Sequence, residues 1–238
     1  MRDRRRRRIV GVICIAVAAI VWIWQNQQFV PSTTPSEPPV EHQRTIPPST
    51  GAQSLRALDV LMQLAVKGRA PRTGYERTNF GDGWSLVGAC DMRNIILHRD
   101  LTEVTVDENC KVTNGVLFDP YTGTHVIFTR GLDTSDDVQI DHVVALSNAW
   151  QTGAQLLTPE RRAEFANDPL ELLAVDGKAN QAKADGDAAT WLPANKAFRC
   201  QYVARQIAVK AKYDLWVTPP EKEAMSRVLQ GCPDQMTP

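Results

Sequence analysis

The sequence predicts an α+β domain organised around a strand–strand–helix unit. The first strand covers residues 138–140 and ends in Asp141-His142. The second begins near Leu170 and is followed by a turn and by a helix that opens near Asn180. Short apolar runs bounded by turn residues are typical of buried strands. Two strands and a helix in this order bring Asp, His and Asn side chains toward one point.

The charge of the chain is unevenly distributed. The 238 residues, enough for one domain and some extra segments, carry 27 basic and 27 acidic side chains. Residues 1–30 hold six Arg and one Asp, so the remainder carries 27 − 6 = 21 basic and 27 − 1 = 26 acidic residues. This balance excludes a polybasic nucleic-acid binder. Any activity on nucleic acid therefore requires a metal ion and a local groove to offset the acidic charge.

The N-terminus predicts export across a membrane. Residues 1–8 form a basic segment containing five consecutive arginines, and residues 9–30 are mainly apolar. This order is typical of a signal anchor or a cleaved signal peptide. Residues 31–51 are rich in Pro, Ser and Thr and read as an extended linker. The domain at 52–238 is therefore expected outside the cell, either attached to the membrane or, after cleavage, secreted.

The cysteines agree with an external location. Cys14 lies in the apolar segment, which leaves an even number of cysteines in the domain: Cys90, Cys110, Cys200 and Cys232. Sequential pairing is the simplest of the three possible connectivities. Each bridge would then close a loop of roughly 20–30 residues and stabilise the fold by about 3 kcal/mol. Zinc binding by the four is the rival interpretation, which the lack of a C-x2-C pair disfavours.

The rest of the domain is predicted to be mostly helical. Apolar spacing, capping residues and turn signals indicate one hairpin and six helices. The hairpin covers residues 111–130, and the helices cover 53–66, 90–100, 143–152, 158–167, 193–215 and 218–229.

The Asp, His and Asn side chains suit phosphodiester hydrolysis. This reaction needs a water nucleophile, a base to deprotonate it, and positive charge near the phosphate. His142 is the candidate base, and Asp141 and Asn180 are candidate ligands of one divalent ion. Oxygen ligands favour Mg²⁺ or Mn²⁺ over Zn²⁺. Lys183 follows Asn180 by one helical turn and is expected to contact a phosphate.

The order Asp-His … Asn-x-x-Lys resembles the ββα-metal, or HNH, endonuclease motif, and the HNH domain of CRISPR nucleases shows the same order. Residues 138–193, and more loosely 75–232, resemble the secreted HNH-family proteins common in actinobacteria, which are related to the C-terminal domain of GmrSD-type restriction enzymes. The resemblance implies a ββα-metal core embedded in a mostly helical, disulfide-stapled domain. It also implies that Asp141 and Asn180 bind the metal and that His142 is the general base.

One position departs from the family pattern. The middle Asn of the motif falls at Glu171 here. In the family that Asn braces the loop and orients the His, and Glu171 is expected to do the same by accepting a hydrogen bond from His142. The same change also fits weakened or lost activity. Two cations are further candidates for binding substrate phosphate, Arg93 and Lys178.

The leading hypothesis is a metal-dependent endonuclease that cleaves DNA, or RNA as well, outside the cell. The alternative is a catalytically weakened HNH-fold domain that serves as a binding or interaction module at the cell envelope. A cell-wall hydrolase lacks support, because the sequence shows neither a nucleophile elbow nor an H-E-x-x-H motif.

Overall fold

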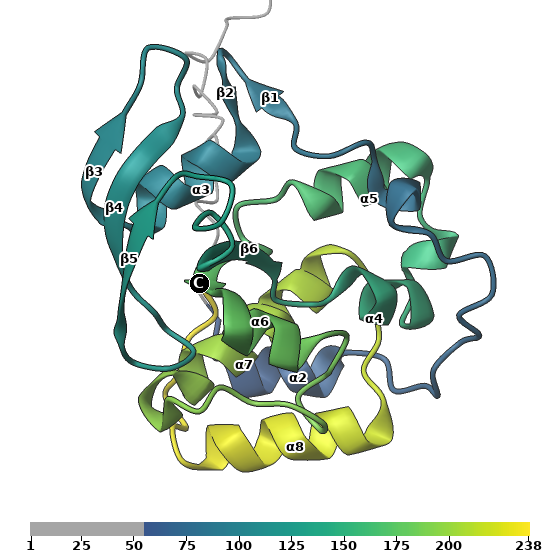
Figure 1. Ribbon diagram of the computed structural model, residues 1–238. Helices are drawn as coiled ribbons and strands as arrows, with labels where there is room; N and C mark the ends of the chain where they lie inside the picture. The colour runs from purple at the N-terminus through teal and green to yellow at the C-terminus, as the bar shows by residue number, and fades with distance from the viewer. Residues whose placement is uncertain (1–54) are drawn as a thin grey trace, which may run out of the picture. The chain divides into compact units, whose positions relative to one another are not determined.

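The computed structural model describes residues 55–238 (Figure 1). These belong to a compact unit that spans Ala52–Pro238. The predicted basic segment, signal or anchor, and most of the linker lie outside the described residues. Within residues 55–238, no helix is long and apolar enough to cross a membrane.

The described chain mixes helices and strands, as the sequence predicts. Antiparallel pairing forms two two-stranded sheets, β1-β2 and β6-β7, and one three-stranded sheet, β3-β4-β5. In order, the elements are α2 (Ala57–Gln63), η1 (Arg77–Phe80), β1 (Leu86–Val87), β2 (Cys90–Asp91), α3 (Met92–Asp100), β3 (Thr102–Val106), β4 (Val112–Phe118), β5 (His125–Thr129), β6 (Val138–His142), α4 (Leu146–Gln151), η2 (Ala154–Leu156), α5 (Pro159–Ala166), β7 (Leu172–Asp176), α6 (Gly177–Lys183), η3 (Lys196–Phe198), α7 (Arg199–Lys212) and α8 (Pro219–Gln230).

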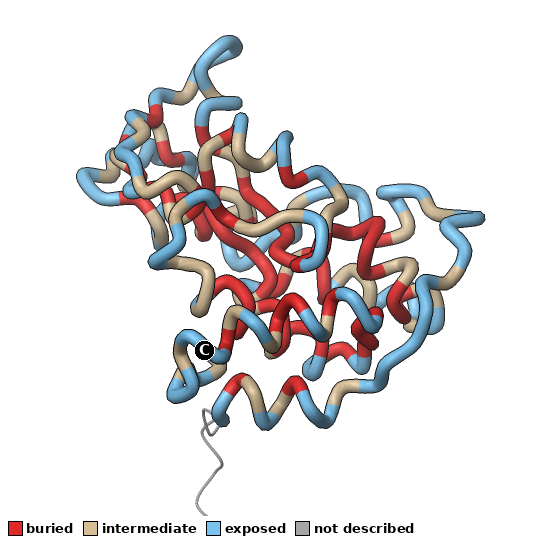
Figure 2. The backbone as a smooth tube through the Cα atoms, turned by 90° about the horizontal axis from the view of Figure 1, so that it is seen from below, coloured by how far each residue is buried: buried red, intermediate tan, exposed pale blue. Residues whose placement is uncertain are grey.

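The sheet of β6 and β7 separates two hydrophobic cores. Ile140 and Ala174, which pair across the two strands, belong to the core formed with α3 and the three-stranded sheet. Leu173 and Val175 belong to the core formed by the helices. Successive side chains on a strand point to opposite faces. Buried segments consequently run through the middle of the molecule, as Figure 2 shows.

The unit β6–β7–α6 realises the predicted strand–strand–helix, although α6 begins earlier than expected. Asp176 caps the helix by accepting a hydrogen bond from the Ala179 backbone N–H at 2.8 Å. Gly177 follows, where an added Cβ would lie 1.9 Å from the Asp136 carbonyl oxygen. Only glycine fits this close approach of two backbones. Asn180 therefore lies in the middle of α6, one turn before Lys183.

Capping residues mark two of the predicted helix starts correctly. Thr158 accepts a hydrogen bond from the Arg161 backbone N–H at the start of α5. Thr218 and Glu221 form a reciprocal capping box at the start of α8. Side-chain acceptors satisfy backbone N–H groups that the first turn of a helix leaves unpaired. These two boundaries are local, which is why the sequence predicts them.

Tertiary contacts shorten two predicted helices. After α2 the chain leaves the helix, and Val66 forms a bridge with Val217. The helix α7 begins at Arg199 rather than near residue 193, because Asn195 bonds to the β4–β5 turn, donating from its backbone to the Tyr121 carbonyl at 2.9 Å. The strand β3 was not predicted. It completes the sheet with the predicted hairpin of β4 and β5.

The predicted disulfide pairing is confirmed. Cys90 is bonded to Cys110, and Cys200 to Cys232, with sequence separations of 20 and 32 residues. The first bridge joins β2 to the turn before β4. The second ties the start of α7 to the residue that closely follows α8. Both bridges lie within the unit of residues 52–238.

We expect thiol titration of a denatured, unreduced fragment of residues 52–238 to detect almost no free thiol. All four cysteines of this fragment are consumed by the two bridges. The matched control is the same sample after reduction, which should release four thiols. Four reactive thiols before reduction would contradict both the pairing and an oxidising location.

Candidate active site

One cavity brings together the three residues that the sequence singled out. It has a volume of about 460 Å³ and lies between β6 and the second half of α6. Asp141 and His142 reach it from β6, and Asn180 reaches it from α6. Its lining also includes Arg72, Tyr75, Arg77, Trp84, Arg93, Gln139, Ile140, Ala145, Leu146, Ser147, Ala184 and Asp185.

Asp141 is fixed by a donor on each carboxylate oxygen. Lys183 Nζ donates to Oδ1 at 2.8 Å, and the Tyr121 hydroxyl donates to Oδ2. Tyr121 comes from the β4–β5 turn, where Asp119 also accepts from the Asp176 backbone N–H at 2.9 Å. Burial raises the pKa of Asp141, and Lys183 and Tyr121 act in the opposite direction. The turn thus ties the three-stranded sheet to both Asp141 and the start of α6.

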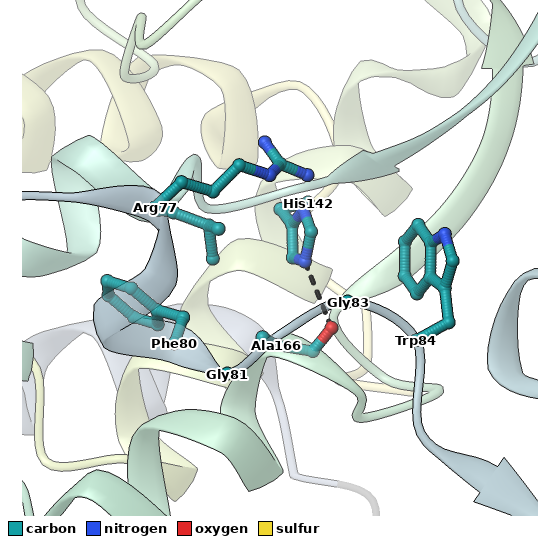
Figure 3. A pocket seen from close by; sticks show the side chains of 8 residues that line it. Arg77, Phe80, Gly81, Gly83, Trp84, His142 and Ala166 are labelled. Atoms are coloured by element: carbon teal, nitrogen blue, oxygen red, sulfur yellow. Dashed lines mark hydrogen bonds between the residues drawn. The ribbon is translucent and has the colours of Figure 1, made fainter.

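His142 is buried and held by two contacts. Its Nε2 lies 3.0 Å from the Ala166 carbonyl oxygen at the end of α5 (Figure 3). Its ring is stacked on the Trp84 indole, with centroids 5.9 Å apart and planes 5° from parallel. Burial lowers the pKa of His142 to about 3, although the bond to Ala166 raises it. The imidazole is therefore neutral at pH 7.

The contact with Ala166 selects one tautomer of the neutral ring. A carbonyl oxygen only accepts hydrogen bonds, so Nε2 must carry the proton and donate it to Ala166. The lone pair is then on Nδ1, the second nitrogen of the ring. This leaves Nδ1 as the proton acceptor of His142, whose ring lines the cavity.

Asn180 presents its amide to the same cavity. Its Nδ2 donates to Gln139 Oε1 at 2.9 Å, so Oδ1 is the atom left for another partner. Gln139 and Asp141 lie on the same face of β6, because they are two residues apart. Asp141 and Asn180 thus present side-chain oxygen to the same cavity from β6 and α6. Within residues 55–238, no cluster of three or more His, Cys, Asp or Glu side chains is arranged to hold a metal ion.

Lys183 has different contacts from those the sequence suggested. Its side chain is 0 % exposed and makes an ion pair with Asp141. Its Nζ also donates to the His142 carbonyl oxygen at 2.7 Å. A fully buried ammonium cannot reach a substrate phosphate at the surface. Lys183 instead holds the end of β6 in place by bonding to both the side chain of Asp141 and the backbone carbonyl of His142.

Glu171 also departs from its expected partner. The structure pairs its carboxylate with the Val144 backbone N–H, at 3.1 and 3.2 Å, and not with His142. The carbonyl of Ala166 occupies the position next to the imidazole. Glu171 therefore braces the loop after β6, as expected, but it does not orient His142. Burial raises the pKa of Glu171 well above its usual range, with the Val144 N–H and Lys183 opposing.

The parent should lose stability as pH rises because Glu171 becomes charged, and we expect Glu171→Gln to lack this loss. The folded-state pKa of Glu171 is raised, so its contribution is fully present below the unfolded pKa of about 4.3 and is lost as pH rises through the folded value. The melting temperature of the parent, relative to the Gln variant, should thus fall from pH 4 toward neutrality. Thermal unfolding in EDTA at several pH values measures this. A difference independent of pH would contradict it.

The two candidate phosphate contacts separate in the structure. Arg93 lines the cavity, and its Nη2 donates to the Val138 carbonyl at 3.1 Å and the Ser135 carbonyl at 3.3 Å. Burial lowers its pKa, and Arg130 adds to that effect. Lys178 is exposed on α6 and does not belong to the cavity lining. Arg93 is thus placed to meet a ligand of this cavity, whereas Lys178 can act only from outside it.

Sequence reasoning missed the residues before β1 that form one wall of the cavity. Arg72, Arg77 and Trp84 lie more than 50 residues before His142 in the chain and carry no motif. Asn167 supports this wall as well. In the structure its Oδ1 accepts from the Ser85 backbone N–H at 2.7 Å, next to Trp84.

Comparison with known proteins gives the family of this domain, which is nuclease-like. Residues 92–228 match the family described as GmrSD restriction endonucleases, C-terminal domain. An uncharacterized secreted protein of Arthroderma benhamiae is 40% identical over 196 residues, which cover 82% of this chain and 91% of that protein. The chain belongs to the GmrSD C-terminal domain family. No solved structure matches it. The HNH assignment and the relationship to actinobacterial proteins stay predictions.

Proposed function

We propose that this protein is a metal-dependent HNH endonuclease that hydrolyses phosphodiester bonds in DNA, with RNA as a possible second substrate. The observation that carries the proposal is the state of His142. Its ring is neutral, its Nε2–H is bonded to Ala166, and its Nδ1 is the remaining acceptor of a ring that lines the same cavity as Asp141 and Asn180. Membership of a restriction-endonuclease family supports the reaction class.

In this mechanism His142 takes a proton from the attacking water at Nδ1. Ala166 and Trp84 hold the ring, so no reorientation is needed as the proton moves. A pKa near 3 is low for a base that works at neutral pH. A bound phosphodiester opposes this lowering of the pKa, because an anion next to the imidazole stabilises the imidazolium, whereas a divalent ion acts in the other direction.

The residues present fit one hard divalent ion such as Mg²⁺ or Mn²⁺. Asp141 on β6 and Asn180 on α6 line the same cavity, and both have side-chain oxygen atoms that can bind a metal ion. Each carboxylate oxygen of Asp141 has two lone pairs, so the bonds from Lys183 and Tyr121 leave one on each oxygen. When bound, such an ion supplies positive charge that polarises the phosphate and stabilises the leaving oxygen.

Three buried residues act through other residues in this scheme. Lys183 and Tyr121 orient the Asp141 carboxylate from its two sides. Glu171 holds the loop after β6 through Val144 and, in this proposal, does not touch the substrate. The Glu at the motif's middle position is thus compatible with activity, since a backbone carbonyl supplies the partner for His142.

We place the folded domain outside the cell, and prefer release to membrane attachment. The Arthroderma relative is described as secreted, and the two disulfides of this chain suit an oxidising compartment. The predicted N-terminal segment would direct export in either case.

Plasmid digestion tests the proposal. We expect the purified protein to convert supercoiled DNA to nicked and linear forms with Mg²⁺ or Mn²⁺, and to stop when EDTA is added. The control is His142→Ala prepared in parallel, which excludes a contaminating nuclease. Binding of DNA with no cleavage under any metal would favour the binding-module alternative. Cleavage that requires tightly retained zinc would contradict the metal assignment.

A further inference from the structure

The cavity gathers positive charge that the chain as a whole does not have. After residue 30 the sequence carries more acidic than basic side chains, 26 against 21. Even so, three arginines line this cavity: Arg72, Arg77 and Arg93. The charge of one of its two carboxylates is compensated by an ion pair. Asp141 is paired with Lys183, and Asp185 accepts a hydrogen bond from the Ser147 hydroxyl at 3.2 Å. The local excess of cations points to an anionic ligand.

Two of these arginines have no internal partner. In the described part of the chain, the guanidinium groups of Arg72 and Arg77 make no hydrogen bond or ion pair with protein. The Arg72 guanidinium lies 5.2 Å from the centre of the Tyr75 ring. Arg77 lies beside the His142 ring, as Figure 3 shows, and also borders a second cavity of about 180 Å³ on that side. Their charges therefore remain available to a ligand.

The segment that carries Arg77 is held in place. The Arg162 guanidinium of α5 donates to the Asn79 carbonyl at 2.8 Å, and Asn79 Nδ2 donates to the Gly74 carbonyl at 2.8 Å. Phe80 packs on Phe165 of α5, with ring centroids 5.8 Å apart. The wall is therefore fixed before a ligand arrives. It also lies outside residues 92–228, the part of the chain that matches the family.

We propose that Arg72 and Arg77 bind phosphates that flank the scissile one, so that the substrate is a polynucleotide strand and not an isolated phosphodiester. A single phosphodiester carries one negative charge, which a divalent ion at Asp141 and Asn180 and the nearby Arg93 already offset. Two further unpaired cations on a rigid wall match neighbouring phosphates of the same strand. This inference rests on the proposed function, because it places the scissile phosphate beside His142.

The test compares the parent with Arg72→Ala/Arg77→Ala in two assays. In the first, fluorescence anisotropy measures binding of a short labelled DNA strand over a range of salt concentrations. We expect the double variant to bind at least about tenfold more weakly. The slope of log affinity against log salt should become shallower by roughly 1.4–1.8, since two phosphate contacts are lost. Arg227→Ala is the matched control, because Arg227 is exposed on α8 and does not line this cavity.

The second assay measures hydrolysis of bis(p-nitrophenyl) phosphate, which has no neighbouring phosphate. The double variant should lose at least about tenfold more efficiency on DNA than on this compound, because only DNA carries the neighbouring phosphates that Arg72 and Arg77 would bind. Equal losses on both compounds, or an unchanged salt slope, would overturn the inference. If the parent hydrolyses neither compound, the proposed function fails. In that case the salt dependence of binding still shows whether Arg72 and Arg77 contact phosphates, since binding does not require cleavage.

Discussion

Replacing His142 by Ala should lower the rate of phosphodiester cleavage by about 10²- to 10⁴-fold, the usual contribution of a positioned general base. The variant removes Nδ1, the acceptor that remains once Nε2–H is bonded to Ala166. Metal binding should survive, because Asp141 and Asn180 are unchanged. Plasmid cleavage measures the rate, and isothermal titration with Mn²⁺ measures the binding.

The companion variant Asp141→Ala separates a base from a ligand. It should lose metal affinity together with activity, and high Mn²⁺ should restore part of the rate. His142→Gln tests a purely structural role, for which residual cleavage would stay near the parental value after correction for the folded fraction. If His142→Ala cleaves plasmid as fast as the parent, the mechanism proposed for this site is wrong.

Lys183→Met should destabilise the fold by about 3–5 kcal/mol, the usual cost of removing one partner of a buried ion pair. The side chains of Lys183 and Asp141 are 0% and 6% exposed, so water cannot replace the lost ammonium. The variant also leaves the His142 carbonyl without its Nζ donor. Urea unfolding in the presence of EDTA measures the change in the free energy of unfolding.

The double variant Asp141→Asn/Lys183→Met supplies the control. It contains neither charge, so it should be more stable than the sum of the two single effects predicts. Additive losses would show that the ion pair with Asp141 does not contribute to the stabilisation by Lys183. The exposed pair Arg161–Glu164 offers a comparison, because breaking a surface ion pair costs about 0–1 kcal/mol.

The elements predicted correctly are those specified by neighbouring residues. Thr158 and Thr218 mark helix starts because the groups they cap lie three residues away. The strand before Asp141-His142 and the strand before Asp176 are short apolar runs closed by polar residues. The disulfide pairing followed from the order of the cysteines. Apart from the disulfide pairing, which depends on the order of all four cysteines, each of these signals can be read within a short window of sequence.

The contacts that were mispredicted join distant segments. Ala166 contacts His142 through a backbone carbonyl, which has no sequence signature. The Glu171 carboxylate accepts a hydrogen bond from the Val144 backbone N–H, because the chain after β6 runs next to this carboxylate. The direction of Lys183 depends on the face of α6 that packs on β6, and α6 begins earlier than expected because Gly177 meets Asp136. Trp84 reaches His142 only through the folded arrangement of β1 and α5.

The position of β6 and β7 between two cores has a consequence for how activity arises during folding. The His142 ring is held by Trp84 and Ala166. Trp84 packs on the core of α3 and the three-stranded sheet, whereas Ala166 belongs to the helical core. A chain in which only one core had formed would lack one of the two contacts that hold the imidazole. Recovery of cleavage after denaturation should therefore follow the slower of the two assemblies. A newly made chain would stay inactive until that last docking step.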